Sequence, residues 1–304
     1  MNIIETNQLT RRFGSIDAVR DLTLVVPQGS VFALLGANGA GKTTAIKVMM
    51  NLLAPSGGTA RVLGVDSQQL GEREFAQIGY VSENQKLPVW MTVRQLLDYC
   101  RPFYPTWDRV LEKKLLGQFD LPEHRVLKQL SRGMLMKAAL LSSLAYRPNL
   151  LVLDEPFSGL DPLARDDFMR GVLEASDLGD WTVFVSSHDI EEVERLADQI
   201  AFIETGRLRF SESTEQLLGR FRRVEVVLGN LGSRVALPLP GWLEFERVGG
   251  LVKFIDPQFD AVATERACRE RFPDSVVKAH PMTLREIYLT LARQTRQEAK
   301  GVAA

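Results

Sequence analysis

The chain has 304 residues, of which 25% are charged and 45% hydrophobic, and this composition is typical of a globular protein with about two domains. Its formal net charge of −1 argues against a surface that holds nucleic acid by bulk electrostatics, so no nucleic-acid partner is expected. Two distant cysteines, no apolar run near the roughly 20 residues of a membrane span, and no signal-peptide pattern together predict a cytoplasmic protein.

Two predicted strands, residues 3–9 and 18–26, alternate apolar and polar side chains as half-buried strands do. A turn at 27–29 leads into a third strand at 30–35, and we expect the three to form a small antiparallel sheet. Phe13 lies in the predicted loop between the first two strands. Taken alone, it is best explained as an aromatic side chain folded back on the core, although an exposed ring there can also stack on a nucleobase.

Residues 36–43 form the pattern G-x-x-x-x-G-K-[ST], with an apolar run before it and a helical pattern, 45–53, after it. Glycine lacks a Cβ atom, so backbone N–H groups can close around phosphate oxygens at the positive end of the helix dipole. Lys42 adds charge for the β- and γ-phosphates, and the Thr43 hydroxyl can bind Mg²⁺. An ordinary glycine turn is the alternative. The predicted cradle contains Gly36, Ala37, Asn38, Gly39, Ala40, Gly41, Lys42, Thr43 and Thr44.

Residues 88–147 differ in character from the segments around them. A strand at 60–65, a helix at 72–77 and a strand at 78–81 come first, and then three helices, 92–101, 107–119 and 132–146, follow without an evident strand. This predicts an all-helical insertion in an α/β domain. Ser131 opens the last helix, either as an ordinary N-cap or as part of a helix N-terminus aimed at a phosphate.

A continuous apolar run, residues 150–153, ends in Asp154 and Glu155 and is typical of a parallel strand buried on both faces. Ligands bind at the carboxyl ends of such strands, so Asp154 can hold Mg²⁺ and Glu155 can polarise an attacking water. A solvated acidic turn is the alternative. A second buried strand, 182–186, is followed by His188, which is either structural or placed to reach the γ-phosphate.

The rest of the chain predicts a helix at 162–174, a helix at 190–197, and a hairpin of 199–204 with 207–211. From residue 215 a second region begins, with strands at 224–228, 242–248 and 251–255 and helices at 261–272 and from 284 onward. It is a small α+β module without a catalytic pattern. Its arginines are best explained as a solvated face.

Together these motifs resemble the nucleotide-binding subunit of an ABC transporter, over about residues 3–212. The Walker A loop is 36–43, Walker B is 150–154, the signature is 130–134, the D-loop is 158–161, and the switch histidine is His188. The resemblance implies a P-loop NTPase of the α/β class, an ABC-type ATPase domain (1–214) with an antiparallel β subdomain and a helical insertion (about 88–147). A C-terminal accessory α+β domain (215–304) would follow.

The resemblance also implies a mechanism. Two subunits, identical or different, would sandwich two ATP molecules head to tail, with Mg²⁺ held by Thr43, Asp154 and Glu83. Ser131, the Gly133 backbone and Asp161 would complete the nucleotide sites, and Phe13 would stack on adenine. The catalytic residues would be Glu155, His188 and Lys42. Dimer closure would drive a transmembrane permease on a separate chain, with this chain peripheral on the cytoplasmic face of the membrane.

The sequence departs from the family pattern at three places. The signature usually reads L-S-G-G-Q, but here Arg132 replaces the first glycine and Met134 the glutamine. Glu83 stands where the family usually has a glutamine, and it would meet Mg²⁺ or water while adding negative charge near the phosphates. The extension beyond residue 214 resembles the appendage of ABC-2-type or antibiotic-efflux ATPases.

The sequence therefore favours the ATP-hydrolysing subunit of a membrane exporter. A soluble ABC ATPase of translation or DNA maintenance is the first alternative, although such proteins carry two cassettes or a long coiled coil. A regulatory ATP-binding subunit with weak turnover is the second, because of the altered signature and Glu83. A membrane protein in the adjacent reading frame, or RNA that co-purifies, would discriminate among them.

Overall fold

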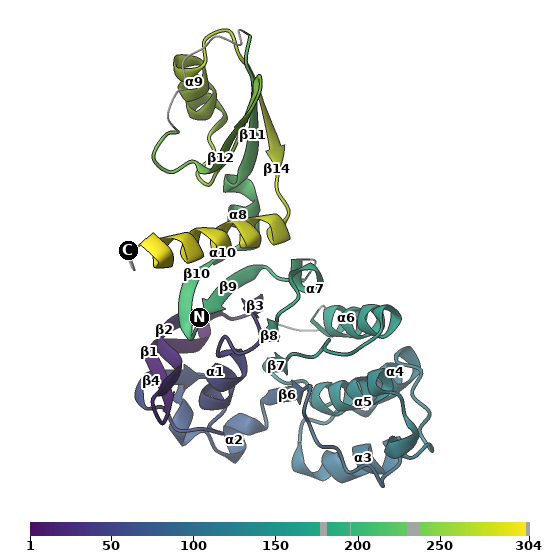
Figure 1. The fold of residues 1–304 in the computed structure, drawn as a ribbon. Coiled ribbons are helices and arrows are strands. Elements are labelled where there is room, and N and C mark those ends of the chain that lie inside the picture. Colours follow the sequence, from purple (N-terminus) through teal and green to yellow (C-terminus); the bar gives the residue numbers. More distant parts are fainter. Residues whose placement is uncertain (177–180, 195, 230–237, 302–304) are drawn as a thin grey trace. The chain divides into compact units, whose positions relative to one another are not determined.

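The computed structural model describes residues 1–176, 181–194, 196–229 and 238–301 (Figure 1). The chain divides into two compact units, Met1–Ser211 and Glu212–Ala304. The sequence interpretation places the boundary slightly later, after residue 214. Each unit has its own sheets and its own apolar core, and each is described separately below.

The first unit contains an antiparallel sheet in the order β2-β1-β4-β5. Its strands are β1 (Asn2–Phe13), β2 (Ile16–Pro27), β4 (Gly57–Val62) and β5 (Val65–Asp66). The prediction that three strands before the glycine-rich loop form this sheet is wrong for the third, β3 (Val31–Leu35), which joins the other sheet of the unit. The reason is that β1 and β2 alternate buried and exposed residues, whereas four of the five β3 residues are buried.

The second sheet of this unit has six strands in the order β10-β9-β3-β8-β7-β6. They are β6 (Ile78–Ser82), β7 (Leu150–Asp154), β8 (Thr182–Ser187), β9 (Gln199–Glu204) and β10 (Arg207–Ser213), together with β3. The pairs β6–β7, β7–β8, β8–β3 and β3–β9 are all parallel. Every residue of β7 and β8 is buried, as expected for central parallel strands covered on both faces.

Helix α1 (Lys42–Met49) lies between the two sheets (Figure 1). Ile46, Val48 and Met49 are fully buried in one apolar cluster that also contains residues of β1, β2, β3 and β8. Phe32 of β3 and Phe184 of β8 stack at 5.7 Å within this cluster. The core therefore holds the N-terminus of α1 against the carboxyl ends of the parallel strands.

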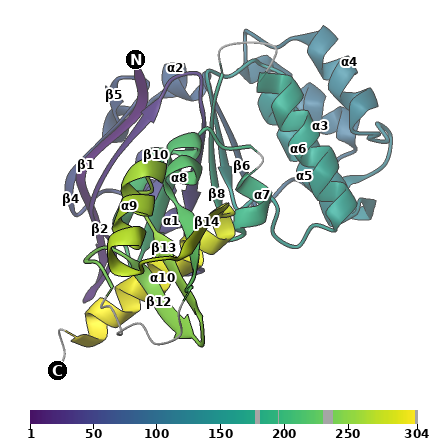
Figure 2. The same cartoon turned by 90° about the horizontal axis from the view of Figure 1, so that it is seen from above.

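The predicted helical insertion is confirmed. It contains α3 (Val93–Cys100), α4 (Arg109–Gln118) and α5 (Arg132–Leu144), which group with α6 (Pro162–Ser176) on the side of the unit away from β1 and β2 (Figure 2). Glu112 of α4 is almost fully buried and accepts hydrogen bonds from Arg94, Arg101 and Trp107, which ties α3, α4 and the segment between them together. Residues 88–147 contain only an isolated bridge, Thr92 with Val126, and no strand.

Short helices complete the unit. They are α2 (Glu72–Phe75), α7 (Ile190–Glu194) and the 3₁₀ turns Ser67–Gln69, Arg101–Phe103 and Leu127–Gln129. In the parts of both units that the structure describes, no helix combines the length and the apolar composition that a bilayer span requires.

The second unit is a four-stranded antiparallel sheet in the order β12-β13-β11-β14 with helices around it. Its elements are α8 (Thr214–Arg220), β11 (Arg222–Val227), β12 (Leu243–Val248), β13 (Leu251–Asp256), α9 (Ala261–Arg271), β14 (Val276–Pro281) and α10 (Leu284–Gly301). Val224, Val226 and Phe254 of the sheet pack with Cys268 of α9. The sequence interpretation missed β14, because this edge strand is mostly exposed and lacks an apolar alternation.

Candidate nucleotide-binding site

Four neighbouring parallel strands end at the same edge of the sheet, and each is followed by a predicted site residue. The strand β3 leads into the glycine-rich loop, β8 into His188, β7 into Glu155, and β6 into Glu83. The register pairs Leu35 with Ser187, and Asp154 with both Ser186 and Ser82. Ligands bind at this edge in parallel sheets.

The glycine-rich loop depends on glycine at two positions for a reason that the motif alone does not reveal. A Cβ atom on Gly36 would lie 2.3 Å from the carbonyl oxygen of Ile203 in β9. Gly41, the N-cap of α1, has φ of +107°, and a Cβ atom there would lie 2.3 Å from the carbonyl oxygen of Ala18 in β2. The backbones of both sheets therefore press against the loop. Its tip, residues 37–39, is exposed and available to a ligand.

Lys42 is buried at the base of this loop, with its side chain only 4% exposed. Its Nζ atom donates to the carbonyl oxygens of Gly36 and Ala37, at 2.5 and 3.1 Å, and lies 2.9 Å from Oε1 of Glu155. A buried ammonium with these partners is held in one place, because each of its protons has an acceptor.

Asp154 and Thr43 meet where β7 ends beside α1. The Thr43 hydroxyl donates to Oδ1 of Asp154 at 2.9 Å, and the Ser186 hydroxyl donates to the same oxygen at 2.9 Å. The pKa of Asp154 lies above its ordinary value because burial disfavours the charged carboxylate. Hydrogen bonds from Ser186 and Thr43 lower the pKa but do not outweigh the burial. The added charge of a cation would favour the carboxylate form.

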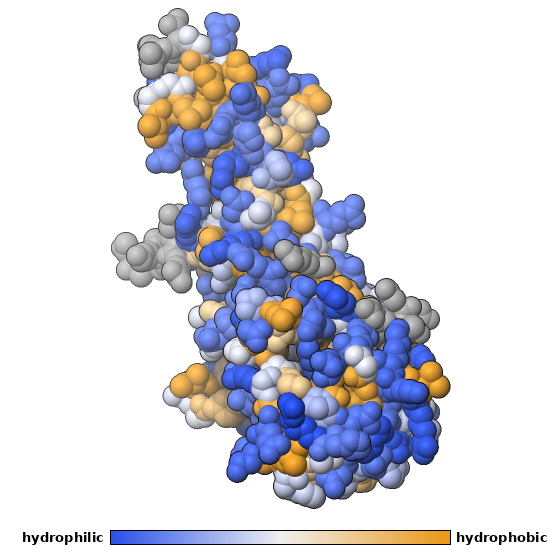
Figure 3. All heavy atoms as spheres, turned by 90° about the vertical axis from the view of Figure 1, so that its right-hand side faces the viewer, coloured by the Kyte–Doolittle hydropathy of each residue, from blue (hydrophilic) through white to orange (hydrophobic). Residues whose placement is uncertain are grey.

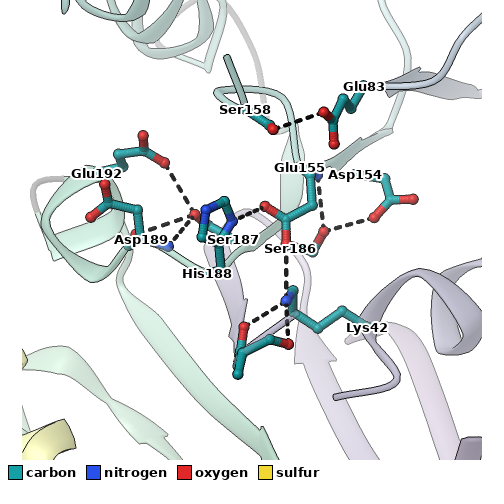
Figure 4. A network of polar contacts seen from close by, with 12 residues as sticks. Lys42, Glu83, Asp154, Glu155, Ser158, Ser186, Ser187, His188, Asp189 and Glu192 are labelled. Atoms are coloured by element: carbon teal, nitrogen blue, oxygen red, sulfur yellow. Dashed lines mark hydrogen bonds and ion pairs between the residues drawn. The ribbon is translucent and has the colours of Figure 1, made fainter. Parts of the chain in front are cut away.

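Glu155 lies between a lysine and a histidine (Figure 4). Its Oε1 faces Lys42, while its Oε2 is 2.7 Å from Nδ1 of His188. The backbone is in the left-handed region, with φ of +53°, and its N–H donates to the hydroxyl of Ser186 at 3.1 Å. This conformation turns the chain sharply at the end of β7.

Glu83 lies close to this cluster but its carboxylate has other partners. The Glu83 N–H donates to the carbonyl oxygen of Asp154 at 3.0 Å, whereas its Oε1 accepts from Arg132 at 2.7 Å and from the Ser158 hydroxyl at 2.8 Å. Burial acts to raise the pKa of Glu83, but the hydrogen bonds from Ser158 and Arg132 outweigh it, so the pKa lies below its ordinary value. The metal role expected for Glu83 stays a prediction.

Phe13, Ser131, Gly133 and Asp161 were also predicted to be site residues. Among the described residues, no hydrogen bond joins any of them directly to the acidic cluster of Asp154 and Glu155. Phe13 ends β1 rather than lying in a loop, is 45% exposed and has the Arg11 guanidinium 4.6 Å from its ring centroid, so it is not folded back on the core. The Ser131 hydroxyl accepts from the Met134 N–H at 3.2 Å as the N-cap of α5.

The other two, Gly133 and Asp161, lie where α5 and α6 begin. A Cβ atom on Gly133 would come within 2.7 Å of Ala164, so this glycine lets the two helices pack closely. The exposed Asp161 accepts from the Ala164 N–H at 2.9 Å and so caps α6. Ser131, Gly133 and Asp161 therefore each have a local structural role, and their contacts with nucleotide stay predictions.

The sequence interpretation missed Ser186 and the contacts that Ser158 and Arg132 make with Glu83. Ser186 donates to Asp154 and accepts from the Glu155 backbone, so it orients both acidic residues. Its position at the end of the apolar strand β8, next to two sites already identified, is a signal that could have identified it. Ser158 was identified only as part of the D-loop, and Arg132 only as a departure from the signature. Their contacts with Glu83 were not predictable, because Glu83 is distant in the sequence.

The donor set fits a magnesium ion that is shared with a nucleotide. A threonine hydroxyl and a carboxylate are both hard oxygen ligands, and they converge at Thr43 and Asp154. Among the described residues, no group of three His, Cys, Asp or Glu side chains could hold a metal by itself. Phosphate oxygens would therefore supply much of the coordination, as is usual for Mg²⁺ in NTPases.

Comparisons with known proteins identify the family of the chain. Residues 19–158 match the ABC transporter family. An ABC transporter ATP-binding protein of Synechocystis is 32% identical over 75% of this chain and 67% of its own length. The bacitracin transport ATP-binding protein BcrA of Bacillus licheniformis is 30% identical over 77% of this chain and 78% of its own. A solved ATP-binding subunit of an ABC transporter superimposes with a TM-score of 0.64 at 27% identity, over 71% of this chain and 91% of that one. The chain therefore belongs to the ABC transporter family of ATP-binding subunits, which bind and hydrolyse ATP.

Proposed function

We propose that the chain is the ATP-hydrolysing subunit of an ABC exporter and that it acts with a separate permease at the cytoplasmic face of the membrane. The observation that carries this proposal is the position of Glu155 between Lys42 and His188, beside the Thr43–Asp154 pair. The relative named for bacitracin transport supports a transport subunit over a soluble ATPase of translation or DNA maintenance.

The residues divide the chemistry among them. The loop N–H groups and Lys42 bind the phosphates, while Thr43 and Asp154 would hold Mg²⁺, which neutralises phosphate charge when bound. Glu155 accepts a proton from the attacking water. His188 holds the Glu155 carboxylate through its 2.7 Å contact, and we propose that it also reaches the γ-phosphate from the same strand edge.

The N-terminus of α5 is proposed to complete the nucleotide site of a second subunit. Its first N–H groups and its positive dipole end favour an anion, and Ser131 already presents its hydroxyl there as the N-cap. ATP would then stabilise the closed dimer because it contacts both subunits only in that state.

We expect Ser131→Ala to weaken ATP-driven dimerisation while leaving ATP binding to the monomer unchanged, since the hydroxyl would contact only the partner's nucleotide. Light scattering with ATP and magnesium measures the dimer. Ser213→Ala is the matched control, because Ser213 caps α8 with a hydrogen bond of the same 3.2 Å length and its loss costs a similar amount, about 1 kcal/mol. Equal dimerisation of the Ser131→Ala variant and the wild type would contradict the proposed sandwich.

The permease is proposed to dock on the helical insertion. A groove of about 350 Å³ there is lined by Leu87, Val89, Leu135, Met136 and Ala139, with Glu83, Gln85, Lys86 and Arg132 also at its walls. Figure 3 views the chain from the side of this insertion and shows apolar patches among hydrophilic residues on that part of the surface. Trp90 is 71% exposed one residue after Val89. An apolar floor with charged walls is typical of a protein-docking site.

We expect a polytopic membrane protein encoded in the adjacent reading frame to co-purify with this chain, and Val89→Asp to abolish the association. Val89 is 46% exposed, so the substitution puts a charge into the groove without disturbing the core. Val110→Asp is the control, because Val110 is 81% exposed in the same insertion but does not line the groove. Basal ATP hydrolysis should be unchanged in both. Capture of the membrane protein by the Val89→Asp variant at the wild-type level would exclude this surface.

A further inference from the structure

Two of the residues at which the sequence departs from the ABC pattern form an ion pair with each other. Arg132, in place of the first signature glycine, puts its Nη2 atom 2.7 Å from Oε1 of Glu83, in place of the usual glutamine. The two residues are separated by 49 positions and lie on different elements, so the fold brings them together. Arg132 adds a positive charge where the family has a neutral glycine, and Glu83 adds a negative charge where the family has a neutral glutamine.

The same arginine also covers the turn between β7 and α6. The Ser158 hydroxyl of this turn donates to the Glu83 oxygen that Arg132 contacts, at 2.8 Å. A Cβ atom on Gly159 would lie 2.9 Å from the Arg132 guanidinium carbon, so the guanidinium rests directly on the turn backbone. Arg132 therefore joins the loop after β6, the start of α5 and the turn after β7.

Each of these three segments also contacts a residue of the nucleotide machinery. The Glu83 N–H donates to the Asp154 carbonyl oxygen, and the Ser158 N–H donates to the Glu155 carbonyl oxygen at 3.3 Å. On the other side, Arg132 directly follows the N-cap Ser131. The ion pair thus lies between the acidic residues of the chain's own site and the helix end proposed to close on the partner's nucleotide.

We propose that Arg132 is a positioning residue, whose ion pair with Glu83 neutralises that carboxylate beside the triphosphate and couples the chain's own ATP site to the α5 N-terminus. This inference rests on the proposed function. An unpaired Glu83 would repel the phosphates from a short distance, since its backbone is bonded to Asp154. The coupling is reciprocal: ATP in the chain's own site favours the α5 position that binds the partner's ATP.

An ordinary surface ion pair is the competing explanation. The two side chains are 49% and 29% exposed, and pairs of this kind contribute little to stability. The two explanations therefore predict different effects when the pair is broken. If it is only a surface pair, its loss should change no property that depends on nucleotide. If Arg132 is a positioning residue, its loss should weaken ATP-driven dimerisation with little change in melting temperature.

The test is a double-mutant cycle with Glu83→Gln, Arg132→Gln and the double variant in the full chain. The readouts are the ATP concentration at half-maximal dimerisation by light scattering, KM and kcat for hydrolysis, and the melting temperature without nucleotide. Arg132→Gln should raise the half-maximal ATP concentration about tenfold, the size of effect expected from one uncompensated charge near a surface. The double variant should return to within about threefold of the wild type, because no charge then lacks a partner.

Arg147→Gln is the control, because it breaks a 2.8 Å pair with Asp108 of similar exposure, 43% and 24%, in the same unit. It should leave every nucleotide readout unchanged. Arg132→Lys, which keeps the charge but not the planar cover on Gly159, should recover part of the loss. If the effects of Glu83→Gln and Arg132→Gln simply added, or if the Arg132→Gln variant responded to ATP as the wild type does, this inference would be overturned and the proposed function would stand. Failure of the wild type to dimerise with ATP would overturn the proposed function and the inference with it.

Discussion

Replacing Glu155 by glutamine is expected to lower the turnover number for ATP hydrolysis by about 1,000-fold while ATP binding stays within about threefold of the wild type. Glutamine has the size of glutamate, so the contacts with Lys42 and His188 can persist in altered form. It cannot accept a proton from water, and the loss of a positioned general base typically costs two to four orders of magnitude, as a rough guide. Phosphate release measures turnover, and calorimetry measures binding.

Glu204→Gln is the matched control for this experiment. Glu204 also ends a strand of the same parallel sheet, β9, but its carboxylate pairs with Arg209. Its replacement should leave turnover unchanged. Retention of wild-type turnover by the Glu155→Gln variant would remove the assigned role of Glu155, whatever the control shows.

Lys42→Met should raise the dissociation constant for ATP by about 100-fold or more, because truncating one charged partner at a buried polar contact costs roughly 2–5 kcal/mol. Methionine fills much of the volume of lysine without its charge, so the side-chain cavity stays occupied. The change also leaves Glu155 without the cation 2.9 Å away, and turnover at saturating ATP should fall as well. Calorimetry with ATP and magnesium measures the affinity.

The comparison is with Lys113→Met on α4. Lys113 is exposed and belongs to the helical insertion, so its substitution should leave ATP affinity within about threefold of the wild type, as for a charge screened by solvent. Equal affinity of the Lys42→Met variant and the wild type would show that the glycine-rich loop does not hold phosphate through this lysine.

The sequence alone predicted those elements whose signal is local. The apolar run that ends in Asp154 forms β7 with the predicted bounds, and the G-x-x-x-x-G-K-[ST] pattern connects a strand to a helix as expected. Residues 88–147 contain three α-helices and no strand, as their periodicity indicates. In each case neighbouring residues carry enough information, because strand burial, glycine turns and helix amphipathicity depend on short segments.

Elements whose place depends on distant partners were not predictable in the same way. Whether β3 joins the first or the second sheet depends on which strands flank it, and β14 forms only because β11 offers an edge for pairing. Phe13 ends a strand with Arg11 over its ring, which no local pattern indicates.

Taken by itself, the sequence determined the glycine-rich loop, the two acidic residues at the end of β7 and the histidine after β8, since each is a short motif next to a recognisable strand. The tertiary structure alone decided that β8 lies between β3 and β7, and this order is what brings His188 to Glu155. It also decided that Arg132 meets Glu83 across 49 positions. The physical reason is that strand order and packing between helices and loops depend on contacts between segments remote in the chain, which a linear pattern does not record.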